Sequence, residues 1–585
     1  MSVDRRLQKA LMLIFKHYIP CSVLCWFIVI SSSNLAMADI NAKVQGVDAP
    51  LTENITTFID AIDNLENLST PLLSRRLKQA IGKATRAMGY YHAEFSLERR
   101  SDELIINVVA GVRTHIVSPE LVIQGAAKDM AVFKEAITTS KLLQGDPLNH
   151  EHFDAYKLNI QSLAQQFGFL DGQFVTAQLR VNREKNTAQP VLIFNSGQRY
   201  RFASVTFVGT SLNQSLLYQI NPVEVGSWVE SETLAALKRK LVSTDYFTQV
   251  EIQRHKDTQT KRLAITVALS DDDNSHYQLG VGYSTDYGAR FRMGWQRRLL
   301  NPAGHSAKVQ SQITSAKQEL EAEYRIPWTQ PLKQYTKLSS GYELTDYEDG
   351  YSRLFNLSAG YVEKRISRWV FSQDISYEWE KYSEDDTDQT VTSYLLPEIS
   401  ATYVTIDKGF DPSHGRRFEG TLEGSNRQLG ADTDFVKAYV AVRQLWPLLS
   451  DKTLLLLRLE LGAIATNDLE LVPLSKRFFT GGDNSIRGYR YQSVAPEDSN
   501  GDKVGGQYLN TFSAEVSHKI LPKWRLATFA DTGRAYTNSN ESFSSSVGVG
   551  VRWLSRAGQI RLDLAHALDD PTTSFLVHIS MGPPL

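Results

Sequence analysis

The sequence predicts a transmembrane β-barrel of about 16 antiparallel strands preceded by three small α/β domains. Three observations lead to this fold class. The N-terminus resembles an export signal, a helix-containing pattern then repeats three times, and alternating strand-like segments fill the rest of the chain. The expected parts are a signal peptide at 1–38, small domains at 39–118, 119–200 and 201–273, and the barrel at 274–585.

The first 38 residues have the three parts of a secretory signal peptide. Basic residues precede an apolar run at 19–30, and the small residues Ala36 and Ala38 form a cleavage site that leaves Asp39 first in the mature chain. A retained membrane anchor is the alternative, but the apolar run is short for a helix that needs about 20 residues to span a bilayer. The segment therefore indicates export.

The composition excludes several classes of site. The two cysteines, Cys21 and Cys25, both lie in the signal peptide, so no disulfide or cysteine–metal site is expected after cleavage. The net charge of −2 gives no basic footprint for nucleic acid. The 25 Tyr, 25 Phe and 9 Trp suit the aromatic girdles of a membrane barrel.

The region 39–270 repeats a pattern with a period of roughly 77 to 79 residues, the size of a small module. An aromatic turn marks each repeat, at 87–91, 166–170 and 244–247. An amphipathic helix precedes each turn, and paired alternating strands follow it. A Gly-x-Arg turn closes the first two repeats, before a new strand begins. Each module is therefore predicted to run strand, helix, helix, strand, strand.

Beyond an acidic linker at 271–274 the helical period disappears. About 16 segments of about ten residues alternate apolar and polar side chains up to residue 581, an even number that allows antiparallel closure. In the segment 559–565, for example, Leu562 and Leu564 share one face, and Arg561 and Asp563 share the other. A β-sandwich is the alternative, but it would not alternate charged and apolar residues on so many strands, and an open sheet cannot lie in lipid.

Three short motifs occur in the last fifth of the chain: Ile486-Arg487-Gly488-Tyr489, Ser513-Ala514-Glu515 and Phe529-Ala530-Asp531-Thr532-Gly533. They resemble the [VI]-R-G-[FY], S-x-E and F-x-D-x-G motifs of the BamA/TamA/two-partner-secretion superfamily, and the repeats resemble its POTRA domains. Three modules, the opening segment 279–286 and the ending 581–585 point to the TamA branch of that superfamily. The last residue, Leu585, departs from the aromatic end of many members.

The resemblance implies that the loop carrying Arg487 folds back into the barrel lumen. Strand alternation independently places Glu515 and Asp531 on the inner faces of adjacent strands. The planar guanidinium of Arg487 suits two carboxylates, and Gly488 permits a close backbone approach. The predicted luminal latch comprises Arg487, Gly488, Tyr489, Glu515, Asp531 and Gly533.

The strands that close the barrel are predicted to pair weakly. Two glycines interrupt the first strand, and the last strand runs into prolines, which cannot donate to a ladder. The predicted seam, or lateral gate, comprises Gly280, Gly282, Phe575, Val577, Ile579 and Pro583.

The resemblance implies a factor in the outer membrane of a Gram-negative bacterium that inserts and folds β-barrel proteins such as autotransporters, with its POTRA-like domains in the periplasm. The implied partners are a TamB-like protein anchored in the inner membrane, unfolded outer-membrane clients and outer-membrane lipid. A secretion pore of the two-partner type is the alternative, although such pores normally have two POTRA modules.

No enzyme activity is expected, because no nucleophile elbow or zinc-protease signature occurs. No metal or other cofactor is expected either. The side chains of His150 and His152 diverge on a helix, and the loop that begins Asp498-x-Asn500-x-Asp502 has Lys503 where a calcium loop needs glycine.

Overall fold

The computed structural model describes residues 41–62, 70–100, 103–365, 367–384, 389–407, 411–555, 558–569 and 575–582. The predicted signal peptide, its cleavage-site residues Ala36, Ala38 and Asp39, and Pro583 of the predicted seam lie outside these residues. The chain forms two compact units. The first ends at residue 197, and the second holds residues 165–170 and everything from residue 198 onward.

The first module has the predicted order of elements. It contains β1 (Asn41–Gln45), α2 (Ala49–Asp60), α3 (Thr70–Ala87), β2 (Glu94–Arg100) and β3 (Glu103–Val109). Strand β3 lies between β1 and β2, parallel to the first and antiparallel to the second. Asp48 caps the N-terminus of α2, because its carboxylate accepts a hydrogen bond from the N–H of Leu51 at 3.1 Å. Its four-residue apolar spacing buries one helix face in the core of the module.

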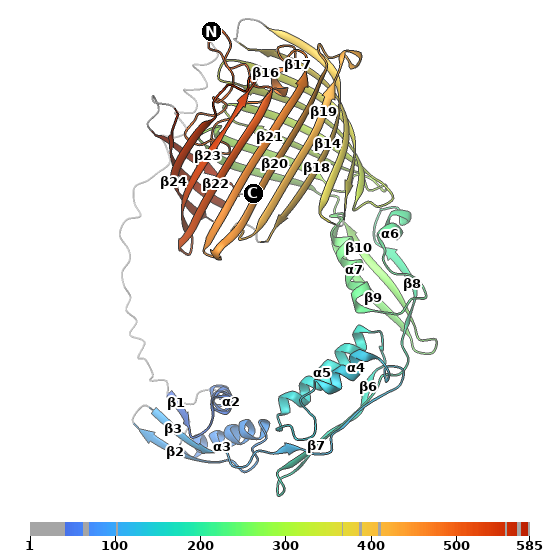
Figure 1. The fold of residues 1–585 in the computed structure, drawn as a ribbon. Helices are drawn as coiled ribbons and strands as arrows, with labels where there is room; N and C mark the ends of the chain where they lie inside the picture. The colour runs from blue at the N-terminus through green and yellow to red at the C-terminus, as the bar shows by residue number, and fades with distance from the viewer. Residues whose placement is uncertain are drawn as a thin grey trace, which may run out of the picture. The chain divides into compact units, whose positions relative to one another are not determined.

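The second and third modules repeat this order, with one additional short strand in the second (Figure 1). The second contains β4 (His115–Ile116), β5 (Glu120–Gln124), α4 (Ala131–Thr138), α5 (His150–Gln166), β6 (Gln173–Asn182) and β7 (Thr187–Asn195). The third contains β8 (Arg201–Val208), α6 (Gln214–Ile220), α7 (Ser231–Val242), β9 (Phe247–Asp257) and β10 (Arg262–Asp271). In each, the opening strand pairs in parallel with the last strand, as β8 does with β10.

The aromatic turns that mark the repeats contact the segment that follows. Arg199 donates from Nε to the carbonyl of Phe167 at 2.6 Å, and Arg113 donates in the same way to Met88 at 3.1 Å. Gly168 has a φ of +77°, and a Cβ there would lie 2.3 Å from the carbonyl oxygen of Val229. Each of these turns therefore contacts the segment that opens the next repeat.

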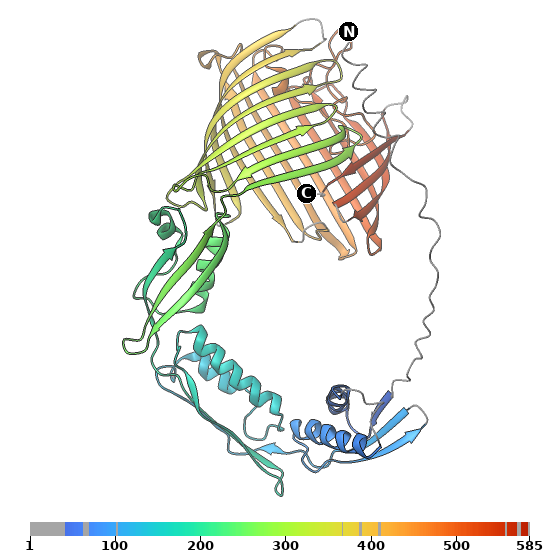
Figure 2. The ribbon, with the colours of Figure 1, turned by 180° about the vertical axis from the view of Figure 1, so that it is seen from behind.

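Sixteen consecutive antiparallel strands form the closed barrel, as predicted (Figures 1 and 2). They are β11 (Ser275–Ser284), β12 (Gly288–Arg297), β13 (Ser306–Ile313), β14 (Lys317–Pro327), β15 (Gln334–Asp346), β16 (Tyr351–Lys364), β17 (Trp369–Ser383), β18 (Thr390–Ile406), β19 (Gly415–Ser425), β20 (Phe435–Ser450), β21 (Thr453–Thr466), β22 (Tyr508–Leu521), β23 (Trp524–Tyr536), β24 (Ser544–Ser555), β25 (Gly558–Ala567) and β26 (Leu576–Met581). Among the helices that the structure describes, none is both long and apolar enough to cross a membrane.

Strand length varies strongly around the barrel. Strand β26 has 6 residues and β13 has 8, whereas β17 has 15 and β18 has 17. The short strands lie next to the point of closure, and the long strands lie on the far side of the strand order. Many outward side chains of the strands are apolar, as the exposed Val547 and Val549 of β24 illustrate, and many inward ones are polar or small, although Phe529 and Leu456 also face inward. The barrel wall is thus low beside its seam.

Candidate functional site

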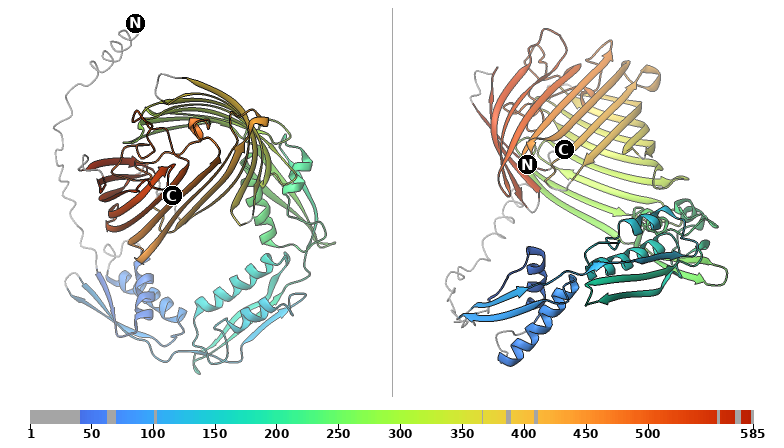
Figure 3. Two further views of the ribbon diagram at one scale, coloured as in Figure 1. Left: turned by 45° about the horizontal axis from the view of Figure 1, so that its top comes forward. Right: turned by 60° about the horizontal axis from the view of Figure 1, so that its bottom comes forward.

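The segment between β21 and β22 folds into the barrel. In the left view of Figure 3 the orange segment that follows β21 lies within the ring of strands. The short helix η3 (Leu474–Lys476) places the ammonium of Lys476 2.9 Å from Glu378 and 3.4 Å from Glu423 on the barrel wall. Arg477 pairs with Glu384 at 2.7 Å. These ion pairs attach the first half of the loop to the wall.

Arg487 binds Glu515 and Asp531, the two carboxylates predicted to lie on the inner faces of adjacent strands. Its Nε and Nη2 donate to the two oxygens of Asp531 at 2.7 and 2.8 Å, and its Nη1 donates to Glu515 at 2.7 Å. The guanidinium also lies over the ring of Phe529, 3.4 Å from the centroid. Arg487 is 1% exposed and Asp531 is 2% exposed. The latch is therefore a buried, bidentate ion pair.

Further charged residues complete the cluster and were not identified from the sequence. Arg552 donates to Glu515 at 2.7 Å and to Asp563 at 2.6 Å, and Arg458 donates to Ser513 at 2.9 Å. Alternation along the strands does place these side chains in the lumen. Which of these luminal side chains form ion pairs depends on the register between the strands, and no sequence motif predicts that register.

The remaining latch residues have separate roles. Gly488 has a φ of +93°, and its N–H donates to Nε2 of His578 on β26 at 2.8 Å. A Cβ at Gly533 would lie 2.4 Å from the carbonyl oxygen of Asn510, so glycine allows β22 and β23 to approach there. The hydroxyl of Tyr489 reaches the carbonyl oxygen of Ser545 at 3.4 Å. The structure therefore brings all six predicted latch residues to one part of the lumen.

The seam is nearly unpaired. The register between β11 and β26 contains the single pair Ser284↔Ser580, whereas β11 and β12 share ten pairs. One further backbone hydrogen bond joins Thr285 N–H to the carbonyl of Ile579 at 2.9 Å. Most of the outer edge of β11 thus has no strand partner among the described residues.

The predicted seam residues lie on these two strands. Gly280 and Gly282 belong to β11 between outward residues such as Val281, which is 79% exposed. Val577 and Ile579 face outward from β26, and Phe575 immediately precedes that strand. The edge of β11 therefore combines free backbone groups with a strongly exposed apolar face.

A second contact of the loop reaches both closing strands, and no motif of the sequence predicts it. His578 on β26 lies 2.7 Å from the carboxylate of Asp483 through its Nδ1. Thr285, at the end of β11, donates to the same carboxylate at 2.7 Å, and the N–H of Asp483 donates to Asp286 at 2.7 Å. Asp483 thus connects the loop to both sides of the seam.

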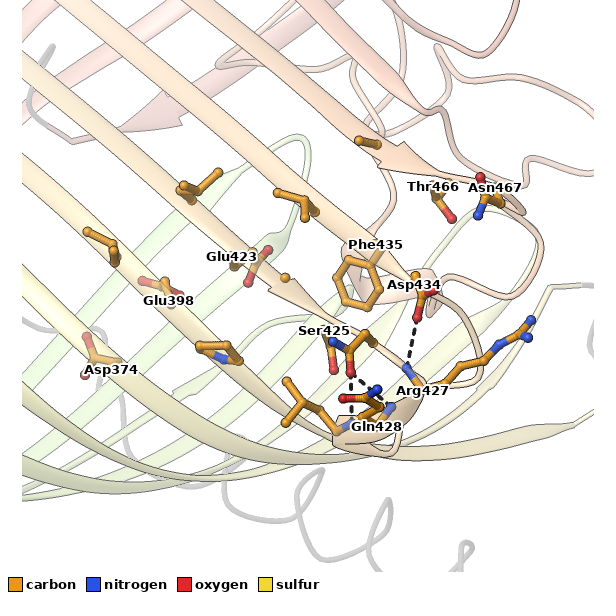
Figure 4. A pocket seen from close by; sticks show the side chains of 18 of the residues that line it. Asp374, Glu398, Glu423, Ser425, Arg427, Gln428, Asp434, Phe435, Thr466 and Asn467 are labelled. Atoms are coloured by element: carbon orange, nitrogen blue, oxygen red, sulfur yellow. Dashed lines mark hydrogen bonds between the residues drawn. The ribbon is translucent and has the colours of Figure 1, made fainter.

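A hollow of about 1270 Å³ lies among the strands from β17 to β21 and the turn after β19 (Figure 4). Asp374, Glu398 and Glu423 occupy neighbouring strands in it. Lys337 pairs with Asp374 at 3.2 Å, and Lys437 pairs with Glu423 at 3.4 Å. Because lysines already neutralise two of the three carboxylates, we regard this row as an ion-pair network of the wall.

Two groups of residues in the sequence resemble metal ligands, the pair His150 and His152 and the loop that begins at Asp498, and side chains of both groups form hydrogen bonds in the structure. His150 lies 2.9 Å from the hydroxyl of Tyr91. The carboxylate of Asp498 accepts the N–H groups of Asn500 at 2.8 Å and Asp502 at 2.9 Å, which closes a turn. The Asp498 pattern thus closes a local turn, whereas Nδ1 of His152 is buried and has no hydrogen-bond partner among the described residues.

Comparison with known proteins agrees with this geometry. Residues 248–582 match the Omp85 superfamily domain, and residues 41–110 match a domain described as POTRA domain TamA domain 1. The outer membrane protein assembly factor BamA of Nitratidesulfovibrio vulgaris (strain Hildenborough) is 25% identical over 369 residues, which are 59% of this chain and 46% of the relative. The BamA of Neorickettsia risticii (strain Illinois) is 21% identical over 406 residues, 64% of this chain and 53% of the relative. The chain thus spans about half the length of these curated relatives.

Among solved structures, the crystal structure of BamA from Haemophilus ducreyi lacking POTRA domains 1–3 has the same fold. Its TM-score is 0.69 at 14% identity, over 80% of this chain and 99% of that one. The fold and the inward loop define an outer-membrane β-barrel protein with POTRA-type domains in the periplasm. Since the matched barrel region covers more than half of the chain, the protein belongs to the Omp85 superfamily.

Proposed function

We propose that this protein inserts and folds β-barrel proteins, autotransporters included, into the outer membrane. The observation that carries the proposal is the edge of β11, which shares only the pair Ser284↔Ser580 with β26. A strand in lipid cannot leave its N–H and C=O groups unpaired. The edge is therefore a template on which the first strand of a client can pair, with its side chains packing beside the apolar face of β11.

This activity requires no covalent chemistry, so we propose that the protein is not an enzyme. Insertion of the client is driven by the exchange of backbone hydrogen bonds between the seam and the client strand. The loop held by Arg487 occupies the lumen at the seam, which favours a lateral route over passage through the barrel. A secretion pore of the two-partner type would need this buried loop to leave, and we rank it second for that reason.

The periplasmic modules offer the place for partners. We propose that they receive unfolded clients and dock a TamB-like protein anchored in the inner membrane. The match of residues 41–110 to a TamA-type POTRA domain supports the TamA branch. Deletion of the gene followed by proteomics of the outer membrane would identify the clients, as the barrels whose abundance falls.

Locking the seam tests the lateral route. Ser284 and Ser580 face each other in the ladder, and both cysteines of the chain precede residue 39. Ser284→Cys with Ser580→Cys therefore places two thiols at a separation that a disulfide tolerates, about 4.4–6.8 Å between Cα atoms. We expect oxidation to stop the folding of an added barrel client in proteoliposomes, and reductant to restore it. Heat-modified migration of the client on gels measures the folding.

The matched control is a disulfide between β22 and β23, where Ser517 and Ala527 are also facing residues. Oxidised Ser517→Cys with Ala527→Cys should leave client folding unchanged. Client folding at the normal rate through a fully cross-linked seam would contradict the proposed function.

A further inference from the structure

Two carboxylates from separate parts of the chain meet beside the seam. Asp286 lies in the turn between β11 and β12, and Asp483 lies in the luminal loop. Ligand atoms of these two residues and of His578 lie within 4.8 Å of one another. Asp483 is 3% exposed, and its Oδ2 has no hydrogen-bond partner, although its Oδ1 accepts from Thr285 and lies against His578. We call Asp286 and Asp483 the seam carboxylate pair.

The hydrogen bonds of His578 decide its role in this group. The N–H of Gly488 donates to Nε2 at 2.8 Å, so Nε2 carries a lone pair. The neutral ring must then carry its proton on Nδ1, which donates to Asp483 Oδ1 at 2.7 Å. A metal on Nδ1 would move the proton to Nε2, where it would oppose the N–H of Gly488. His578 therefore orients Asp483 from outside the site, and only oxygen atoms remain as ligands.

Among the residues that the structure describes, neither carboxylate forms an ion pair with a lysine or an arginine, and the one basic group in contact with Asp483 is the ring of His578. The N–H of Asp483 donates to Asp286 at 2.7 Å, and Gly482 leaves space for that carboxylate, since a Cβ there would lie 2.6 Å from Asp286 Oδ2. Arg561, the nearby cation, donates to Asn484 at 3.3 Å.

A buried carboxylate oxygen without a hydrogen-bond partner, in a cluster that holds a second carboxylate, suits a cation. We propose that the seam carboxylate pair binds one hard divalent cation of the Mg²⁺ or Ca²⁺ class. Such ions take oxygen ligands, and Mg²⁺ in particular is held by one or two carboxylates while it keeps several waters. A cavity of about 540 Å³ is lined by Asp286 and His578, though not by Asp483, and offers an entry path and room for those waters on the Asp286 side of the pair.

The position of the site gives the cation a structural consequence. Asp286 follows β11, whereas Asp483 is tied to β26 through His578. A cation between the two carboxylates would join the closing strands through the loop, beside the single ladder pair Ser284↔Ser580. Cation binding would therefore favour the closed seam.

The test uses the full-length protein in detergent, treated with EDTA and desalted. Mn²⁺, a paramagnetic ion of the same class, is titrated and followed by electron paramagnetic resonance, with Mg²⁺ and Ca²⁺ as competitors. We expect the wild type to bind one more Mn²⁺ per chain than Asp286→Asn or Asp483→Asn, or to bind it at least tenfold more tightly. Asp498→Asn, which alters the calcium-like turn, is the matched control and should bind as the wild type does.

Heat-modified migration on gels checks that each variant is folded. If Asp483→Asn disturbs the loop, the comparison of the wild type with Asp286→Asn still tests the site. Equal Mn²⁺ binding by the wild type and by folded Asp286→Asn would overturn the site and assign the ions to lipid phosphates. Preferred binding of Zn²⁺ that is abolished in His578→Gln would overturn the oxygen-only ligand set.

Cross-linking of Ser284→Cys with Ser580→Cys should be slower after EDTA; an unchanged rate would overturn the link between the strands. None of these readouts depends on client insertion, so the proposed function is tested separately.

Discussion

At the scale of single residues, the latch depends on the shape of one side chain as much as on its charge. Arg487 uses three nitrogens on two carboxylates and stacks on Phe529, an arrangement that an ammonium cannot reproduce. Without this side chain Glu515 would keep Arg552, whereas the described residues would leave Asp531 with Arg458, at 3.9 Å, and with the backbone N–H of residue 487. Asp531 is therefore the residue that loses most when Arg487 is removed.

Arg487→Ala should release the loop from the wall. Breaking a buried pair from one side costs about 3–5 kcal/mol, and the burial of Asp531 places this pair in that class. Arg487→Lys should recover only part of the loss. Limited proteolysis of the loop and thermal unfolding in detergent measure the effect. Arg490→Ala, which changes an exposed arginine of the same loop, is the control. Resistance of Arg487→Ala equal to that of the wild type would show that the pair does not hold the loop.

At the scale of elements, the alternation and the repeat period of the sequence predicted which elements form and which strand faces point inward. They did not predict which residues contact one another. The order of elements in each module and the inward faces of Glu515 and Asp531 follow from spacing, because a strand reverses its face at every residue. Arg552 and Asp563 could not be matched to the latch, since their meeting depends on the register of β24 and β25 relative to β22. His578 and Asp483 lie 95 residues apart, and only the folded loop brings them together.

The aromatic turn at 166–170 gives a prediction at this scale. Gly168→Ala should destabilise the third module, because φ is +77° and the new Cβ would lie 2.3 Å from the Val229 carbonyl oxygen. A left-handed residue other than glycine costs about 1–2 kcal/mol, and the clash adds to that. Gly226→Ala is the matched control, since its φ is +88° and nothing lies within 4 Å. Thermal unfolding should separate the two variants; equal shifts would show that the clash is absent.

At the scale of the whole molecule, the third module belongs with the barrel. The hydroxyl of Tyr246 donates to the carbonyl of Gly304 in the turn between β12 and β13 at 2.9 Å, and Leu299 is part of the core of that module. The aromatic turn of the last repeat therefore contacts the barrel as the earlier turns contact the next module. The predicted boundary near residue 273 separates the elements along the chain, but it cuts through this core.

Fragments test this division. A fragment of residues 39–197 should be soluble without detergent and show mixed α and β circular dichroism, because the first two modules have cores of their own. A fragment of residues 39–273 should contain a third module that unfolds at lower temperature than in the whole chain, since it lacks Leu299 and Gly304. Hydrogen exchange of α7 in the two contexts measures the difference, and equal protection would contradict the shared core.

The low wall beside the seam has a consequence for the surrounding lipid. At about 3.4 Å per residue and a tilt of about 40°, the 6 residues of β26 rise about 16 Å along the membrane normal, and the 17 residues of β18 rise about 44 Å. The hydrocarbon layer is about 30 Å thick, so acyl chains beside β26 must shorten and splay to meet the wall. The protein would thus carry a permanently compressed patch of bilayer at its opening, where a polar hairpin has the shortest distance to cross.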